Sequence, residues 1–266
     1  MAAADSTGAG APARAPVVAI VSAIDDELHA LIAVLRNAGS VQLAGRTFLR
    51  GEIAGRPVVL VRSGMGKVAA ATTAALALQV FEARQLVFTG VAGGLQAGVD
   101  VGDVVVARQL LQHDMDASPL FPRFEVPSTG RSHFDCDAEL SDALADAARH
   151  CLAGADVLIG DGPRALGIEA PRVHRGLIVS GDCFVATAAR SAALRALLPD
   201  ALAVEMEGAA VAQVCTDFGR PFAVLRTVSD RADDAAHVDF RRFVAEVAGA
   251  YTRAIVEAWL QSELLQ

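Results

Sequence analysis

The chain has 266 residues and a net charge of −8, with 53% hydrophobic and 20% charged residues. This length fits one α/β domain, and the apolar content excludes a largely disordered chain. Lys67 is the only lysine and no basic block occurs, so the sequence lacks the electrostatic footprint of a protein that binds nucleic acid or an anionic membrane. A small molecule is the expected partner.

The sequence predicts neither a membrane-spanning helix nor a secretory signal. The longest weakly polar run, residues 68–81, is interrupted by polar side chains and is shorter than the about 20 apolar residues that a spanning helix needs. Residues 1–15 are rich in Ala and Gly and lack a basic n-region, so we expect them to form a disordered tail. The single domain is then expected to cover residues 16–266.

The four cysteines stand at positions 136, 151, 183 and 215 and form no CxxC pair. This spacing fits neither a zinc cluster nor the disulfide framework of a small secreted domain. We therefore expect reduced, mostly buried thiols and a cytoplasmic location.

Apolar runs of strand length alternate with Ala-rich helical segments along the chain. Strands are expected at 17–22, 48–53, 57–61, 86–89, 103–107, 177–180, 201–204 and 222–225, the second and third joined in a hairpin. Helices are expected from residue 23 to about 37, at 67–81, and near 186–198, 207–218 and 239–261. The last helix has an apolar stripe at helical spacing, formed by Val244, Val247, Tyr251, Ile255 and Trp259.

This alternation predicts the fold class. Nearly continuous apolar strands that alternate with helices are typical of an α/β protein. We expect a single domain with a central mixed, mostly parallel sheet flanked by helices on both faces. Residues 112–135 and 153–173 are punctuated by Pro and Gly and break the rhythm, so they are expected to be functional loops or linkers.

Candidate site residues follow the strands, because ligands of open α/β sheets bind beyond the carboxyl ends of the strands. The residues delivered there include four carboxylates, one arginine, one aromatic and two glycine turns: Glu27, Glu205, Glu207, Asp230, Arg226, Phe184, and the turns at 64–66 and 90–94. Each has an ordinary structural explanation when taken alone. Carboxylates in the first turn of a helix complement its dipole, for example, and a lone phenylalanine is usually core.

The glycine turn at 64–66 can be compared with two known phosphate-binding motifs. Residues 64–69 read GxGxxA, the dinucleotide fingerprint, yet the acidic residue expected about 20 positions later is missing. The same turn does not complete a Walker A motif. Taken together, carboxylates around a pocket with one arginine suit sugar chemistry, because they can bind ribose hydroxyls, stabilise an oxocarbenium charge and serve as acid and base.

The series of motifs resembles the nucleoside phosphorylase/nucleosidase superfamily, and most closely its 5′-methylthioadenosine/S-adenosylhomocysteine nucleosidases. The segments that carry the resemblance occur in family order: AIDDEL (23–28), SGMGKVAAA (63–71), TGVAGGL (89–95), VGDVVV (101–106), GLIVSGDCFV (176–185), AVEMEGAAVAQVC (203–215) and RTVSDRAD (226–233), with His237 and Phe240. The resemblance implies a nucleoside phosphorylase-like fold. It also implies a homodimer in which a loop reaches the neighbour's site, and no metal or organic cofactor.

The resemblance also implies a role for individual residues. Glu27 would activate the attacking water, and Asp230 would donate a proton to N7 of the purine. Glu207 would hold the ribose 2′ and 3′ hydroxyls, with Met206 packing on the sugar, and Phe184 would stack on the base. Arg226, Ser229 and Glu205 would support these groups. The backbone of Val185 would read the edge of the base, and Phe240 and Ile24 would line the pocket for the 5′ substituent.

Three features depart from the family, and one of them is the segment 153–173, which is longer than usual. Val91, a further candidate substrate contact, stands where relatives commonly carry serine. Residues 112–135 do not match, which leaves substrate choice open, and Phe121 and Phe124 within them are expected to be buried in a subunit interface formed by residues 117–126. Lys67, at a helix start, is expected to be a solvated surface group.

The expected activity is hydrolysis of the N-glycosidic bond of 5′-methylthioadenosine and S-adenosylhomocysteine, with release of adenine. The alternatives are a purine nucleoside phosphorylase, for which Arg62 would be the extra cation at the phosphate, and a non-catalytic protein that binds purine nucleosides. A dinucleotide-dependent oxidoreductase is a third possibility, weakened by the missing ribose acid.

Overall fold

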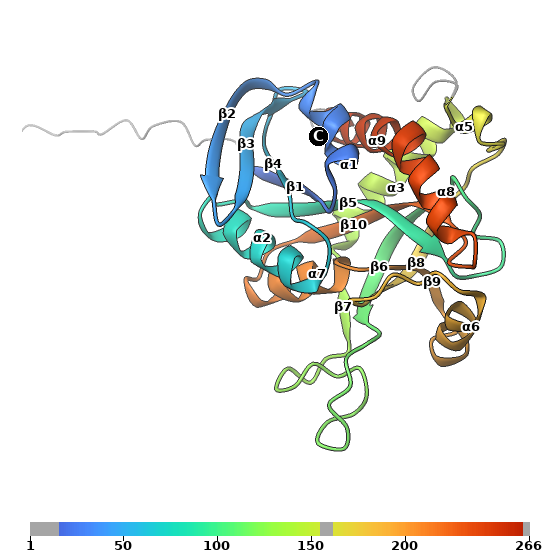
Figure 1. The fold of residues 1–266 in the computed structure, drawn as a ribbon. Coiled ribbons are helices and arrows are strands. Elements are labelled where there is room, and N and C mark those ends of the chain that lie inside the picture. Colours follow the sequence, from blue (N-terminus) through green and yellow to red (C-terminus); the bar gives the residue numbers. More distant parts are fainter. Residues whose placement is uncertain (1–15, 155–161, 263–266) are drawn as a thin grey trace, which may run out of the picture.

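The computed structural model describes residues 16–154 and 162–262 (Figure 1). The tail expected at 1–15 and part of the 153–173 segment lie outside the described residues. The strands are β1 (Val18–Ser22), β2 (Arg36–Leu43), β3 (Arg46–Ile53), β4 (Arg56–Arg62), β5 (Gln85–Gly94), β6 (Val104–Gln112), β7 (His133–Asp135), β8 (Val173–Ser180), β9 (Ala201–Glu205) and β10 (Phe222–Asp230). The helices are α1 (Asp25–Ile32), α2 (Lys67–Gln79), α3 (Ala138–Ala153), α5 (Gly162–Ala165), α6 (Ala188–Leu197), α7 (Gly208–Asp217), α8 (Ala236–Phe243), the π-helical turn η1 (Val244–Ala248) and α9 (Gly249–Ser262). None of these helices is both long and apolar enough to cross a membrane.

The strands form one mixed sheet, which confirms the predicted fold class. Parallel pairs join β4, β1, β5 and β10 in one part of the sheet and β6, β8 and β9 in another. Antiparallel pairs join β2 to β3, β3 to β4, β6 to β7, β10 to β6 and β5 to β9. Because β10 pairs with both β5 and β6, the strands β5, β10, β6, β8 and β9 close into a ring. Gly93 of β5 is paired with Val204 of β9 and with Asp230 of β10, so three strands meet at this residue.

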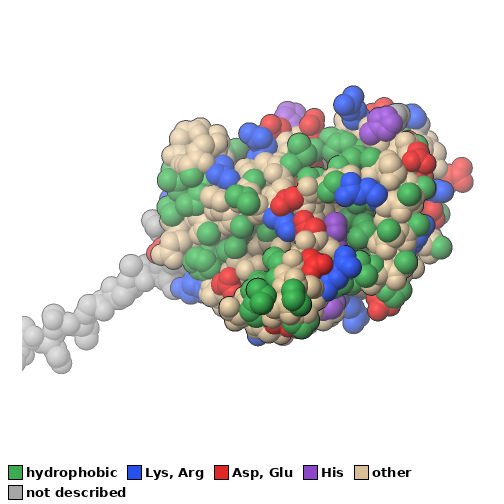
Figure 2. Space-filling model, turned by 60° about the horizontal axis from the view of Figure 1, so that its bottom comes forward, with side chains coloured by type: hydrophobic (Ala, Val, Ile, Leu, Met, Phe, Trp, Pro, Cys, Tyr) green, Lys and Arg blue, Asp and Glu red, His purple; other side chains and the backbone are tan. Residues whose placement is uncertain are grey.

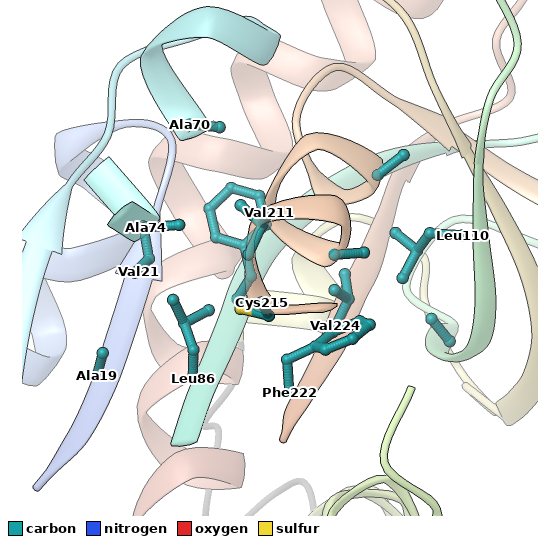
Figure 3. Packing of buried hydrophobic residues seen from close by; sticks show 14 of the residues in the cluster. Ala19, Val21, Ala70, Ala74, Leu86, Leu110, Val211, Cys215, Phe222 and Val224 are labelled. Atoms are coloured by element: carbon teal, nitrogen blue, oxygen red, sulfur yellow. The ribbon is translucent and has the colours of Figure 1, made fainter. Parts of the chain in front are cut away.

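Helices cover both faces of the sheet, as predicted. In Figure 1, α2 and α7 lie on one side, and α1, α3 and α9 lie on the other. Figure 3 shows the first layer, in which alanines of α2 and Val211 and Cys215 of α7 pack on Leu86 and Phe222 of the strands. On the other face, the predicted stripe of the last helix is buried at all five positions. Burial of aliphatic and aromatic side chains on both faces is the main stabilising contribution of this arrangement.

Several predicted elements differ in extent. The first helix ends at Ile32 rather than near residue 37, and residues 36–43 form β2, an edge strand in which every residue except Leu43 is exposed. Its sequence lacks the apolar alternation of a half-buried strand, and its place is fixed by the turn into β3, where Ala44 and Gly45 both have positive φ. Helix α3 and strand β7 were not predicted, and β5, β6, β8 and β10 are longer than expected.

Candidate active site

A cleft of about 570 Å³ opens where β5, β9 and β10 end beside the first turn of α1. This volume lies in the range of small-molecule sites. The residues that line it are Ala23, Ile24, Glu27, Met65, Val91, Ala92, Gly93, Cys183, Phe184, Val185, Val204, Glu205, Met206, Glu207, Ser229, Asp230 and Phe240. Every predicted site residue lines the cleft except Arg226, which lies buried behind it. Met65 and Cys183 were not predicted as contacts, although both stand in the strand-end segments that marked the site.

Glu27 is held by three backbone amides. Its Oε2 accepts hydrogen bonds from the amides of Ala23 and Ile24 at 3.0 and 3.1 Å, and its Oε1 accepts one from Val91 at 3.0 Å. Burial raises the pKa of this carboxyl, and the positive charge of Arg226 and the three amides offset only part of that effect. A carboxylate with a raised pKa is a stronger base, so Glu27 is suited to accept a proton.

The approach of Arg226 to Glu27 requires glycine at position 90. A Cβ atom there would lie 2.5 Å from Nη1 of Arg226 and 2.6 Å from Oε1 of Glu27, and the φ of +152° also favours glycine. This glycine within β5 therefore lets a cation and a carboxylate meet behind the cleft.

Glu205 organises the start of α7. Its carboxylate accepts hydrogen bonds from the amides of Gly208 and Glu207 at 2.8 and 3.1 Å, from the hydroxyl of Ser180, and from the guanidinium of Arg226. Both members of the ion pair are almost completely buried. Because a buried charge is costly unless it is paired and hydrogen-bonded, this cluster fixes the positions of its neighbours. Glu205 and Arg226 are thus placed to support the site, as the resemblance implied.

Glu207 faces the cleft with an incomplete set of partners. Its Oε1 accepts a hydrogen bond from the amide of Gly66 at 2.8 Å, and its Oε2 lies 3.6 Å from the guanidinium of Arg226. Burial and repulsion from Glu205 raise the pKa of Glu207 to about 7, against the opposing effects of Arg226 and Gly66. When ionised, this carboxylate can accept hydrogen bonds from two adjacent hydroxyls and attract a positive charge that develops beside it.

A β-bulge aims Asp230 at the cleft. The register between β10 and β5 shifts between Val228 and Asp230, so Ser229 is skipped and Asp230 pairs with Gly93. Bulges of this kind redirect side chains next to active sites. Asp230 accepts hydrogen bonds from the hydroxyl of Ser229 and the amide of Ala232, both at 2.8 Å.

The pKa of Asp230 is raised above its ordinary value. Burial is the largest cause, and the hydrogen bond from Ser229 opposes it. Repulsion from the charges of Asp239 and Asp233 adds to the rise. The raised pKa favours a protonated carboxyl at higher pH, which suits a general acid.

Two aromatic side chains stand at the mouth of the cleft. Phe184 has 41% of its surface exposed, so it is not a core residue. Its ring meets that of Phe240 of α8 edge to face, with centroids 5.7 Å apart. An exposed ring at the edge of a cleft offers a surface on which a planar base can stack.

We expect Phe184→Ala to weaken adenine binding by about 1–3 kcal/mol, the range measured for base–aromatic stacking in nucleic-acid sites. Because the ring is exposed, its removal leaves no core cavity, and the melting temperature should stay close to that of the wild type. Isothermal titration with adenine measures the effect. An unchanged affinity would exclude stacking by Phe184.

Cations are not found in the lining of the cleft over the described ranges 16–154 and 162–262. Arg62, the extra cation considered for a phosphorylase, is half exposed and pairs with Asp25 at 3.0 Å. Within the same ranges, no group of three or more His, Cys, Asp or Glu side chains could hold a metal ion. The cleft therefore offers carboxylates and an aromatic ring, and it has few means of holding a phosphate ion.

The expectation for Lys67 is wrong. Its side chain is only 16% exposed, and Nζ donates hydrogen bonds to Oδ1 of Asp114 at 2.6 Å and to Oε1 of Gln112 at 3.1 Å. Lys67 is shielded from solvent because its ammonium binds Gln112 and Asp114 at the end of β6. These partners are distant from Lys67 in the sequence.

The mixed sheet, the closed ring of strands and the carboxylate-lined cleft at the strand ends together define a nucleoside phosphorylase-like α/β protein. The model of the phosphorylase superfamily matches residues 17–261, and the chain belongs to this superfamily.

Relatives of the chain include the 5′-methylthioadenosine/S-adenosylhomocysteine nucleosidase of Shewanella denitrificans. It is 36% identical over 243 residues, which cover 91% of this chain and 98% of the relative. The crystal structure of the nucleosidase of the same name from Neisseria meningitidis, in complex with methylthio-immucillin-A, has a TM-score of 0.81 and 35% identity and covers 92% of this chain and 99% of the other. The S-adenosylhomocysteine nucleosidase of Streptococcus pyogenes, in complex with 5-methylthiotubericidin, has a TM-score of 0.82 and 30% identity and covers 95% of this chain and 99% of the other.

Proposed function

We propose that the protein hydrolyses the N-glycosidic bond of 5′-methylthioadenosine and S-adenosylhomocysteine, with release of adenine. Glu27 would act as the base and Asp230 as the acid. The activity is that of the nucleosidases to which the chain is similar over nearly its full length. The observation that carries the assignment of the residues is that two buried carboxyl groups, both with raised pKa, face one cleft, Glu27 from the first turn of α1 and Asp230 from the end of β10. Such a pair can act as base and acid in the same reaction.

The reaction breaks the bond between C1′ of the ribose and N9 of the purine. The bonding electrons move into the purine, and Asp230 supplies a proton to N7. The ribose becomes cationic as the base departs, and the negative charge of Glu207 stabilises it. Water then bonds to C1′ and gives a proton to Glu27, so the products are adenine and the 5-thioribose.

Binding of the substrate uses the remaining residues of the cleft. Phe184 would stack on the base, and the backbone of Val185 would read its edge. Met206 would pack on the ribose. The 5′ substituent would lie in the apolar part of the cleft, which is formed by Ile24, Met65, Val91 and Phe240.

Release of adenine in phosphate-free buffer tests the function directly. Purified protein should yield adenine and 5-methylthioribose from methylthioadenosine at the same rate with and without phosphate, because the cleft has no cationic lining in its described part and Glu27 would repel an anionic nucleophile. Liquid chromatography of the products distinguishes the outcomes. Strict dependence on phosphate, with a ribose 1-phosphate as product, would instead favour the phosphorylase.

A homodimer is the assembly that we propose for this enzyme. Met65 and Val68, at the start of α2 beside the cleft, are 66% and 80% exposed, and Leu120, in the segment between β6 and β7, is 84% exposed. Figure 2, which turns the lower side of Figure 1 toward the viewer, shows hydrophobic side chains gathered among charged ones on the surface of that side. Exposed apolar groups of this kind are typical of interaction sites.

Phe124, which is expected at the subunit interface, is half-buried within its own chain, where it packs on a cluster that includes Leu111, Val179 and Val185. Leu120 is therefore the better probe of the interface. Light scattering should give about twice the chain mass of 27.5 kDa for the wild type. Leu120→Asp should shift the mass toward the monomer. A wild type that is monomeric and fully active at micromolar concentration would contradict the dimer.

We also propose a cytoplasmic location and a single domain that covers residues 16–266. The cysteines are all free in the described residues, which is the usual state in a reducing compartment. Redox labelling of the thiols in intact cells tests the location.

A further inference from the structure

Three segments that border the cleft are joined by a ring of polar contacts that the mechanism does not use. Nζ of Lys67 donates a hydrogen bond to Oδ1 of Asp114 at 2.6 Å. The other oxygen of Asp114 accepts one from the amide of Asp182 at 2.9 Å. Oδ1 of Asp182 in turn accepts one from the backbone amide of Lys67 at 2.7 Å. The contacts therefore close on themselves, and they link the glycine turn before α2, the end of β6 and the segment after β8.

The ring lies between two groups that the proposed function assigns to the substrate. The amide of Gly66, adjacent to Lys67, donates to Oε1 of Glu207 at 2.8 Å. Phe184 follows Asp182 by two residues and stands at the mouth of the cleft. Two successive amides of one glycine turn thus hold the ribose carboxylate and the segment that carries the base-stacking ring. A displacement of this turn would move both.

The composition of the chain supports a specific need for lysine at this position. Of the 23 lysine and arginine residues, 22 are arginine, and the one lysine is Lys67. The side chain of Lys67 is only 16% exposed, and its compact ammonium directs donors to Asp114 and to Gln112. A planar guanidinium is larger and fixes its donors in a fork, so arginine cannot reproduce these contacts.

Further contacts anchor the ring to the core. Nε2 of Gln112 donates to Oε1 of Gln213 on α7 at 2.9 Å, and the amide of His113 donates to the carbonyl oxygen of Ser180 at 2.9 Å. Gly181 leaves room for the buried imidazole of His113, because a Cβ atom there would lie 2.4 Å from the ring. The pKa of Asp114 is lowered. Burial acts to raise it, but the hydrogen bonds from Lys67 and the Asp182 amide, together with the charge of Lys67, outweigh burial, so the carboxylate is ionised in the ring.

We propose that Lys67, Asp114 and Asp182 are positioning residues that hold the glycine turn and the 182–185 segment in register, and so align Glu207 and Phe184 on the substrate. This inference rests on the proposed function. Misplacement of reacting groups by about 1 Å can cost about 100-fold in rate. Loss of the ring should therefore change catalysis more than stability.

The test compares Lys67→Met, Asp114→Asn and the double variant with the wild type. We expect each single variant to lower kcat/KM for methylthioadenosine by about 10–100-fold and to weaken adenine binding severalfold. The double variant should lose no more than either single one, because residues that act as one unit are not additive. Lys67→Arg should not restore activity. Asp146→Asn, which removes an exposed ion pair with Arg149 on α3, is the matched control and should behave like the wild type.

Asp182 provides a second pair of variants with little risk to folding, because its side chain is exposed. Asp182→Ala removes the acceptor of the Lys67 amide and should reproduce the defect. Asp182→Asn keeps an acceptor oxygen and should retain activity close to that of the wild type. Melting temperatures of the Asp182 variants should stay near that of the wild type.

Several outcomes would overturn the inference. These are wild-type kcat/KM in the single variants, losses that multiply in the double variant, or a fall in melting temperature with unchanged activity per folded molecule. The proposed function fails separately, if the wild type releases no adenine. In that case the affinity for adenine, measured by titration of the same variants, still decides whether the ring positions Phe184.

Discussion

Replacement of Asp230 by Asn is expected to lower kcat for adenine release by about 10²–10⁴-fold, the usual contribution of a general acid. Asparagine has the shape of aspartate but cannot give up a proton to N7. The fold should tolerate the change. The amide oxygen can still accept from Ala232, and the hydroxyl of Ser229 can turn from donor to acceptor to meet the new NH₂ group.

The pH profile distinguishes loss of the acid from a general disturbance. The acid acts in its protonated form, so wild-type kcat/KM should fall as the pH rises through the pKa of Asp230, which burial raises above the ordinary value. Asp230→Asn should lack this alkaline limb. Adenine affinity and melting temperature are the controls. Retention of more than about a tenth of the wild-type rate would exclude the general-acid role.

The place of the site could be predicted from the sequence because it depends on topology. Apolar runs marked where the strands end, and the carboxyl ends of neighbouring strands meet at one edge. Glu27, Glu207 and Asp230 were therefore expected together, and they line one cleft. The stripe ending at Trp259 was predictable for a similar reason, since helical spacing alone decides which side chains face the core.

Features that depend on the path of a loop or on pairing between distant segments could not be predicted. The partners of Lys67 are Gln112 and Asp114, and nothing in local periodicity indicates that the end of β6 passes beside the start of α2. The bulge that turns Asp230 toward the cleft arises from the register with β5, which the sequence of β10 does not contain. Strand β2 is held by its pairing with β3 and has no buried face to give a pattern.

Replacement of Glu27 should abolish nearly all activity, by about 10²–10⁴-fold, because water then has no base to take its proton. Glu27→Gln alone does not separate the loss of the base from a loss of stability. Three backbone amides point at the carboxylate, so the NH₂ group of glutamine must face at least one N–H donor, and an unsatisfied buried donor costs about 1–3 kcal/mol. Stability should therefore fall together with activity, and the melting temperature must be measured beside the rate.

The acidic limb of the pH profile gives a second signature of the base. Glu27 must be ionised to accept a proton, so wild-type kcat/KM should fall as the pH drops through its raised pKa. Glu207, whose pKa is raised to about 7, contributes to the same limb because only its ionised form attracts the cationic ribose. In Glu27→Gln, the limb that remains should belong to Glu207 alone.

Chemical rescue separates the base from a structural carboxylate. Glu27→Ala removes the negative charge and leaves space beside the cleft for a small anion such as azide. Azide needs no base, so its nitrogen can bond to C1′ as the bond to N9 breaks, while Asp230 still protonates the purine. We expect millimolar azide to restore adenine release by Glu27→Ala and to yield the ribosyl azide, which mass spectrometry detects. The wild type should form none, because Glu27 repels the anion at the point of attack. If azide had no effect on a folded Glu27→Ala enzyme that still binds adenine, the role of Glu27 would be to hold β5 in place through Val91, and the base would have to be sought elsewhere in the cleft.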